Sequence, residues 1–109
     1  MSDDDVSINQ EELKELRIKA GVHDRLVKHL DKRKDVQNID LMILSGFCRN
    51  CLCKWYLAEA NTLGLDIDMD EARRQIYGME YTDWKKQYQS SATNAQLSAF
   101  NNIKPEQTS

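Results

Sequence analysis

The feature that most constrains the fold of this chain is the near absence of proline. The only proline is Pro105, so residues 1–104 lack the residue type that most strongly interrupts helices. Apolar residues recur at alternating spacings of three and four, whereas no segment shows the period of two that is typical of a half-buried strand. The sequence therefore predicts an all-α protein, a compact multihelical domain of four to six helices around one long central helix.

Two apolar stripes predict the two longest helices. The first stripe consists of Leu13, Leu16, Ala20, His23, Val27 and Leu30. An S-x-x-Q capping box at 7–10 predicts where its helix begins, and Gly21 is a point at which that helix could bend or split. The second stripe consists of Leu41, Leu44, Cys48, Cys51, Trp55 and Ala58. Since apolar residues also flank it, we expect a central helix from Ile39 to Leu63, ending at Gly64 and buried on most sides.

Capping signals predict shorter helices in the second half of the chain. A D-x-x-E box at 68–71 predicts a helix that ends at Gly78, Thr82 is the expected N-cap of the next, and a T-x-x-Q box at 93–96 predicts the last. The aromatic residues of this half are Trp55, Tyr56, Tyr77, Tyr81, Trp84 and Tyr88. We expect them to anchor the core rather than to form a stacking platform for a ligand.

The length of 109 residues predicts a single domain. We expect it to span residues 9–103, between an acidic, flexible N-terminus at 1–8 and a flexible tail at 104–109. The N-terminus lacks the basic and apolar stretches of a signal peptide, and no apolar run approaches the ~20 residues that span a bilayer. The sequence therefore predicts a cytoplasmic protein without a membrane segment.

Charge is distributed unevenly although the net charge is only −3. Residues 17–34 carry seven basic side chains, which makes nucleic acid or an acidic partner conceivable. No glycine- or aromatic-rich RNA-binding pattern accompanies them, so a solvated helix face explains them better. We therefore do not expect nucleic acid as a partner.

The cysteines form the most informative segment. Cys48 and Cys51 make a C-x-x-C pair, and Cys53 follows out of register with them. Two thiolates three residues apart on a helix share a face, so they could hold zinc or iron, with His29 as a third ligand. Alternatively, the pair packs as small apolar side chains in the core. On either interpretation Cys53 is incidental.

A thiol-redox role for the same pair is a further alternative. Redox C-x-x-C pairs lie at a helix N-terminus, where the helix dipole favours the thiolate. The predicted helix over 39–63 instead places this pair in its middle, where Cβ atoms three residues apart are about 5–6 Å from one another. A disulfide needs about 3.8 Å, so the prediction disfavours this chemistry.

A cluster of polar residues precedes the cysteines and forms a candidate binding site. Its members are Asp35, Gln37, Asn38 and Asp40 before the predicted central helix, and Arg49, Trp55 and Tyr56 on it. Helix capping explains the first four equally well. The chain has no nucleophile elbow, phosphate-binding glycine loop or H-E-x-x-H motif, so catalytic activity is not indicated.

These observations favour a noncatalytic helical interaction or regulatory module. Because the predicted central helix is too apolar for a short bundle to cover, we expect a homodimer, and another protein is a further conceivable partner. The alternative is a metal-binding or thiol-redox protein that uses Cys48, Cys51 and His29.

Several motifs resemble a known family of short bacterial proteins. They are Asp35-Val-Gln-Asn-Ile-Asp-Leu-Met, Gly46-Phe-Cys-Arg-Asn-Cys-Leu with Lys54-Trp-Tyr, Glu71-Ala-Arg, Tyr77-Gly-Met, Tyr81, Trp84-Lys and Tyr88-Gln. Over residues 25–100 the chain resembles the proteobacterial domain-of-unknown-function family 1244. The resemblance implies an all-helical fold and a cytoplasmic bacterial protein, and it implies no reaction.

The resemblance also bears on single residues. His29 matches a histidine of the family's first motif. The family usually has serine at the position of Cys53, which supports treating this cysteine as incidental, and it has proline where this chain has Glu80.

Overall fold

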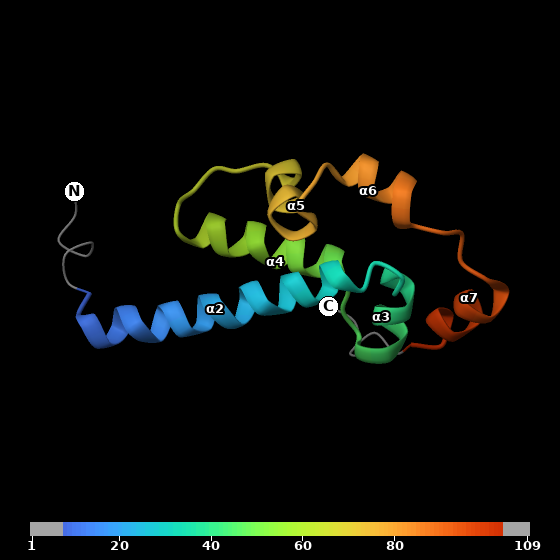
Figure 1. Cartoon of the computed structure of the whole chain (residues 1–109), viewed down its shortest axis with the longest axis horizontal. Helices are drawn as coiled ribbons and strands as arrows, with labels where there is room; N and C mark the ends of the chain where they lie inside the picture. Colours follow the sequence, from blue (N-terminus) through green and yellow to red (C-terminus); the bar gives the residue numbers. More distant parts are fainter. Residues whose placement is uncertain (1–7, 104–109) are drawn as a thin grey trace. The chain divides into compact units, whose positions relative to one another are not determined.

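The computed structural model describes residues 8–103, and every regular element in that range is a helix (Figure 1). The helices are α2 (Gln10–Lys32), α3 (Asn38–Ser45), α4 (Arg49–Thr62), α5 (Met69–Tyr77), α6 (Tyr81–Tyr88) and α7 (Asn94–Asn101). This confirms the predicted all-α fold. The expectations for residues 1–7 and 104–109, including the capping residue Ser7, lie outside the described residues.

The chain divides into two structural units, residues 1–32 and residues 33–109. Within the described range, the first contains α2 and the second contains α3 to α7. Between residues 8 and 103, none of the helices has the length and apolar character needed to cross a membrane. The single domain over 9–103 stays a prediction.

The first unit is built on α2, which continues through Gly21 without a break. Its N-terminus is capped by Asn9, whose Oδ1 accepts the Glu12 backbone N–H at 2.8 Å and whose Nδ2 donates to the Glu12 carboxylate at 3.0 Å. Asn9 satisfies an N–H group that has no partner inside the helix, so the helix begins directly after it.

The predicted central helix over Ile39–Leu63 is wrong, because the chain forms two helices there. Gly46 adopts φ 79°, and its N–H donates to the Met42 carbonyl at 2.9 Å, which closes α3. This left-handed conformation suits glycine, which lacks the Cβ that would clash. Cys48 is extended, with φ −146°, and its carbonyl accepts the first N–H bonds of α4. The apolar spacing continues across the break, so periodicity alone did not reveal it.

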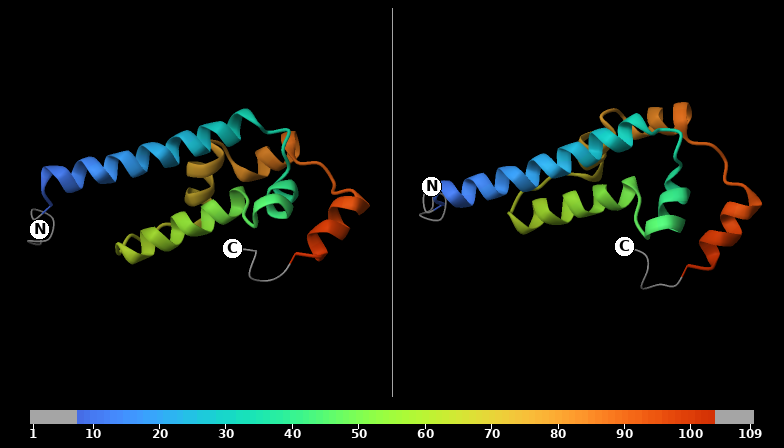
Figure 2. Two further views of the ribbon diagram at one scale, coloured as in Figure 1. Left: turned by 90° about the horizontal axis from the view of Figure 1, so that it is seen from below. Right: turned by 60° about the horizontal axis from the view of Figure 1, so that its bottom comes forward.

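The core of the second unit lies where α4 packs against α5, with α6 beside α5 (Figures 1 and 2). Its buried members on these three helices include Cys51, Leu52, Cys53, Ala60, Ala72, Ile76, Tyr77 and Trp84. Tyr77 and Trp84 are therefore core anchors, as predicted. Trp55 is not one, since it is 45% exposed and stacks on Phe47 with a centroid distance of 6.0 Å.

Cys53 lies on the buried face of α4 at 1% exposure, although the sequence placed it out of register with the apolar stripe. Arg49, Cys53 and Ala60 are spaced four and seven residues apart, so they share one face of α4, and all three are buried. The second apolar stripe, over residues 41–58, was inferred for a single helix over residues 39–63, and that helix does not form. The buried face of α4 is therefore displaced from the one that the sequence indicated.

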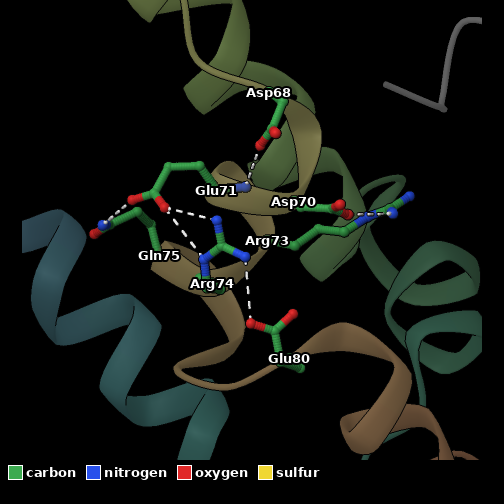
Figure 3. Close-up of polar contacts among 7 residues, drawn as sticks. All are labelled: Asp68, Asp70, Glu71, Arg73, Arg74, Gln75 and Glu80. Carbon is green, nitrogen blue, oxygen red and sulfur yellow. Dashed lines mark hydrogen bonds and ion pairs between the residues drawn. The ribbon is translucent and has the colours of Figure 1, made fainter.

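The capping predictions for the last helices are mostly confirmed. The Asp68 carboxylate accepts the Glu71 N–H at 2.8 Å (Figure 3). Gly78 ends α5 with φ 72°. Arg74 then bridges Glu71, at 3.0 Å, and Glu80, at 3.2 Å, across the turn that leads to α6.

Of the remaining two predicted N-caps, the one at Thr93 is confirmed and the one at Thr82 is wrong. Thr93 and Gln96 form the expected capping box, with bonds of 3.1 and 2.8 Å. Thr82 is not the N-cap of α6, which begins one residue earlier, at Tyr81, with Glu80 as its N-cap. The Glu80 carbonyl, which accepts the Trp84 N–H at 3.0 Å, starts the helix before the threonine is reached.

Candidate functional site

A buried arginine lies at the centre of the predicted polar cluster. Arg49 is 3% exposed, and its guanidinium donates to the carbonyls of Val36 and Arg33, each at 2.8 Å. It also donates to Asn38 Oδ1 at 3.1 Å and lies 5.2 Å from the ring centroid of Trp84. Arginine suits this position because its rigid fork presents several donors at once. The segment before α3 is thereby attached to α4 and α6.

A second chain of hydrogen bonds continues from Asn38 to α6. Asn38 Nδ2 donates to the Tyr77 hydroxyl at 3.0 Å, and this hydroxyl donates to Asn50 Oδ1 at 2.7 Å. Asn50 Nδ2 in turn donates to the Tyr81 hydroxyl at 3.3 Å. Asn50 and the two tyrosine hydroxyls were not among the predicted cluster residues. The signal that could have found Asn50 is its place beside Arg49 in the C-R-N-C motif.

Gln37 and Asp40 attach the C-terminal part of the unit to the start of α3. Gln37 Nε2 donates to the Tyr88 carbonyl at 2.9 Å, and Gln37 Oε1 accepts the Ser90 N–H at 3.0 Å. Asp40 accepts the Gln37 backbone N–H at 3.1 Å and the Gln96 side chain at 2.8 Å. Gln37 is therefore the N-cap of α3, and Asp40 completes its capping box, so helix capping accounts for these two members of the predicted cluster.

The other members of the predicted cluster lie elsewhere. Asp35 is exposed and accepts two hydrogen bonds of 3.1 Å from Arg33, which hold the pKa of its carboxyl below the usual value. Trp55 contacts Phe47, and the bonds described above involve neither Trp55 nor Tyr56. The structure shows internal hydrogen bonding at this cluster, and ligand binding there stays a prediction.

Raising the pH across 10 is expected to destabilise the fold through Tyr77. Burial is the main cause that raises the pKa of this phenol well above its ordinary value of 10.0. Above that pH the unfolded chain releases a proton that the folded chain keeps, so stability falls as pH rises, by up to about 1.4 kcal/mol per pH unit. Urea unfolding of the wild type and of Tyr77→Phe on both sides of pH 10 measures this slope. An unchanged slope in the variant would contradict the assignment.

The C-x-x-C pair lies at the N-terminus of α4, which corrects the prediction that it lies in the middle of a helix. Cys48 is the N-cap residue, Cys51 lies in the first turn, and their Sγ atoms are 3.9 Å apart. Cys51 Sγ also lies 3.8 Å from Met42 Sδ at the end of α3. The break at Gly46 causes this placement, so the position within the helix no longer disfavours redox chemistry.

The three thiols are buried, and burial raises the pKa of two of them, Cys48 and Cys53. Burial raises the pKa of Cys48, although backbone N–H groups of Asn50 and Cys51 oppose this shift. Burial likewise raises the pKa of Cys53 to about 11. Cys48 and Cys53 are therefore protonated at neutral pH. Because the thiolate is the nucleophile and the metal ligand, either residue must lose its proton before it reacts or binds a metal.

The predicted third metal ligand, His29, lies on α2 in the first unit, whereas both cysteines belong to the second. Within either unit, residues 8–103 contain no group of three or more His, Cys, Asp or Glu side chains that could hold a metal ion. Joint coordination by Cys48, Cys51 and His29 stays a prediction.

Comparison with known proteins agrees with the motifs. No curated protein matches the chain. The family described as "Protein of unknown function (DUF1244)" matches residues 36–102, which include α3 to α7 with the polar network and the C-x-x-C pair. α2 lies outside this range. Because the match covers more than half of the 109 residues, the chain belongs to the DUF1244 family.

Proposed function

We propose that this protein is a noncatalytic helical module that acts by pairing with a second copy of itself through α2. The observation that carries the proposal is an apolar stripe on this 23-residue helix, in which Leu16 is 52% exposed. In proteins most of the stability of a helix comes from covering its apolar face rather than from the helix alone. A second copy of α2 is a cover of matching length and chemistry.

The spacing of the stripe is that of a coiled coil. Leu13, Ala20 and Val27 are seven residues apart, as positions a are, and Leu16, His23 and Leu30 follow as positions d. This register covers residues 13–30 of α2, but Leu30 at its end is already buried at 8% exposure, so the part of the stripe open to a second copy ends at Val27. Positions a and d together form the seam between the two helices. Ala20 and His23, in the middle of this seam, give little apolar contact, so we expect a reversible dimer rather than a permanent one.

Charges beside the seam favour two parallel helices in register. Position g of one heptad then faces position e of the next heptad on the other helix. Glu12 would face Arg17 of the second copy, and Lys19 would face Asp24 of the second copy, so both pairs have opposite charges. Lys19 now forms an ion pair of 3.1 Å with Glu15, but this pair is exposed and can be exchanged readily.

This surface differs from the one that suggested a dimer in the sequence. The apolar residues of the predicted central helix are divided between α3 and α4. On α4, Cys51, Leu52, Cys53 and Ala60 already lie in the core of the second unit. The support for a dimer therefore comes from α2 and its flanking charges.

Charge exchange between positions 12 and 17 tests the pairing. Arg17→Glu would place like charges opposite each other twice in the dimer, and we expect the dimer Kd to rise roughly 5- to 30-fold. The double variant Glu12→Arg/Arg17→Glu restores opposite charges and should recover most of the affinity. Sedimentation equilibrium over a range of protein concentrations measures each Kd, and far-UV circular dichroism reports any loss of helix at the Asn9 cap.

Arg25→Glu is the matched control, since it makes the same change in charge at position f, on the face away from the seam. It should leave the Kd unchanged. The proposal fails if the wild type stays monomeric at its highest soluble concentration, or if Arg25→Glu weakens the dimer as much as Arg17→Glu does.

A further inference from the structure

We propose that Cys48, Cys51 and Met42 form a binding site for a soft monovalent metal ion, copper(I). The three sulfur atoms come from the end of α3 and the start of α4. Cys51 Sγ is the common neighbour, 3.9 Å from Cys48 Sγ and 3.8 Å from Met42 Sδ. This inference does not depend on dimer formation through α2.

The spacing of the sulfur atoms suits a shared metal ion. With metal–sulfur bonds of about 2.3 Å, neighbouring ligands are about 4.0 Å apart in a trigonal plane and about 3.8 Å apart in a tetrahedron. The two distances from Cys51 Sγ, to Cys48 Sγ and to Met42 Sδ, both fall in this range. A disulfide would instead need the two cysteine sulfurs to approach to about 2.05 Å. The observed arrangement therefore fits coordination with less movement.

The break between the two helices brings these residues together. The Met42 carbonyl accepts the Gly46 N–H at 2.9 Å, which fixes the last turn of α3. Cys48 is extended and Cys51 is in the first turn of α4, so both thiols lie where the helix dipole stabilises negative charge. Cys48 and Cys51 are both buried, so water competes little for the ion.

The ligand types at this site, two thiolates and one thioether, determine which metal ion it prefers. Thiolate and thioether ligands together favour copper(I), whereas zinc and iron sites take thiolate, imidazole or carboxylate ligands. Methionine thus replaces the predicted His29 as the third ligand. Binding would convert two thiols and one copper(I) ion into a complex of charge −1, with release of two protons to solvent.

Copper(I) titration of the full chain tests the site. Under anaerobic conditions, with bicinchoninate as the coloured competitor, we expect the wild type to take one equivalent of copper(I). Cys48→Ala and Cys51→Ala should each weaken binding more than about 100-fold, beyond the effect of losing an outer-shell partner. Met42→Leu keeps the side-chain volume and should weaken binding by about 10-fold or more with little loss of stability.

Cys53→Ala is the matched control, since it removes a third buried thiol two residues from Cys51. It should bind copper(I) like the wild type. X-ray absorption at the copper edge of the wild type should show three sulfur ligands at about 2.3 Å. The site is refuted if the wild type does not compete for copper(I), or if Cys53→Ala loses as much affinity as Cys51→Ala. Two sulfur ligands, or full affinity in Met42→Leu, would overturn the assignment of Met42.

Discussion

Replacing Trp84 by alanine is expected to lower the free energy of unfolding by about 3–5 kcal/mol. Its side chain is 1% exposed, and its ring lies 4.8 Å from that of Tyr77 and 5.8 Å from that of Tyr88. Alanine would leave a cavity among these rings and remove the aromatic surface on which the Arg49 guanidinium lies. Urea unfolding followed by far-UV circular dichroism measures the loss.

The second tryptophan of the chain provides the matched control. Trp55 is 45% exposed and contacts Phe47, so much of its surface already faces solvent. Trp55→Ala is expected to lower the free energy of unfolding by less than about 1.5 kcal/mol, because burial of the side chain contributes only roughly half of its full apolar transfer energy. Equal losses for the two variants would show that Trp84 does not occupy the core described here.

Replacing Arg49 by methionine is expected to lower the free energy of unfolding by about 3 kcal/mol or more. Methionine fills a similar apolar space but donates no hydrogen bond, so the carbonyls of Arg33 and Val36 and the Asn38 amide oxygen each lose a partner. An unsatisfied buried polar group costs about 1–3 kcal/mol. Thermal and urea unfolding of the variant measure the sum of these losses.

Two further variants separate the effect of the donor geometry of Arg49 from the effect of its charge. Arg49→Lys keeps the charge but presents its donors from one atom, so it should fall between the wild type and Arg49→Met. Arg33→Met removes an arginine whose side chain is 54% exposed, and it should leave stability nearly unchanged. If Arg49→Met is no more destabilising than Arg33→Met, the hydrogen bonds of the Arg49 guanidinium do not stabilise the junction between α3 and α4.

The sequence predicted the local features of this protein well. The cap at Asp68, the capping box at Thr93 and the glycine that ends α5 all involve bonds between residues a few positions apart. Such contacts depend on residue types at fixed spacing, which are visible in the sequence. The longest helix, α2, was recognised for the same reason, because its apolar spacing is a local pattern.

The errors arose where a local pattern allowed two outcomes. Gly46 can continue a helix at a modest cost or end it in a left-handed conformation, and the apolar spacing is the same on both sides. The choice depends on partners distant in sequence, such as the Asn38 side chain, which accepts the Arg49 N–H at 3.3 Å. The position of the C-x-x-C pair and the burial of Cys53 follow from that choice.

The sequence by itself determined that the chain is helical, where α5 begins and ends, where α7 begins, and to which family the chain belongs. Only the tertiary structure decided which polar residues become buried and which sulfur atoms meet. Arg49 and Tyr77, for example, share the partner Asn38, whose Oδ1 accepts from Arg49 and whose Nδ2 donates to the Tyr77 hydroxyl 39 positions along the chain. Burial makes such contacts decisive, because a polar group removed from water must find its hydrogen bonds inside the fold.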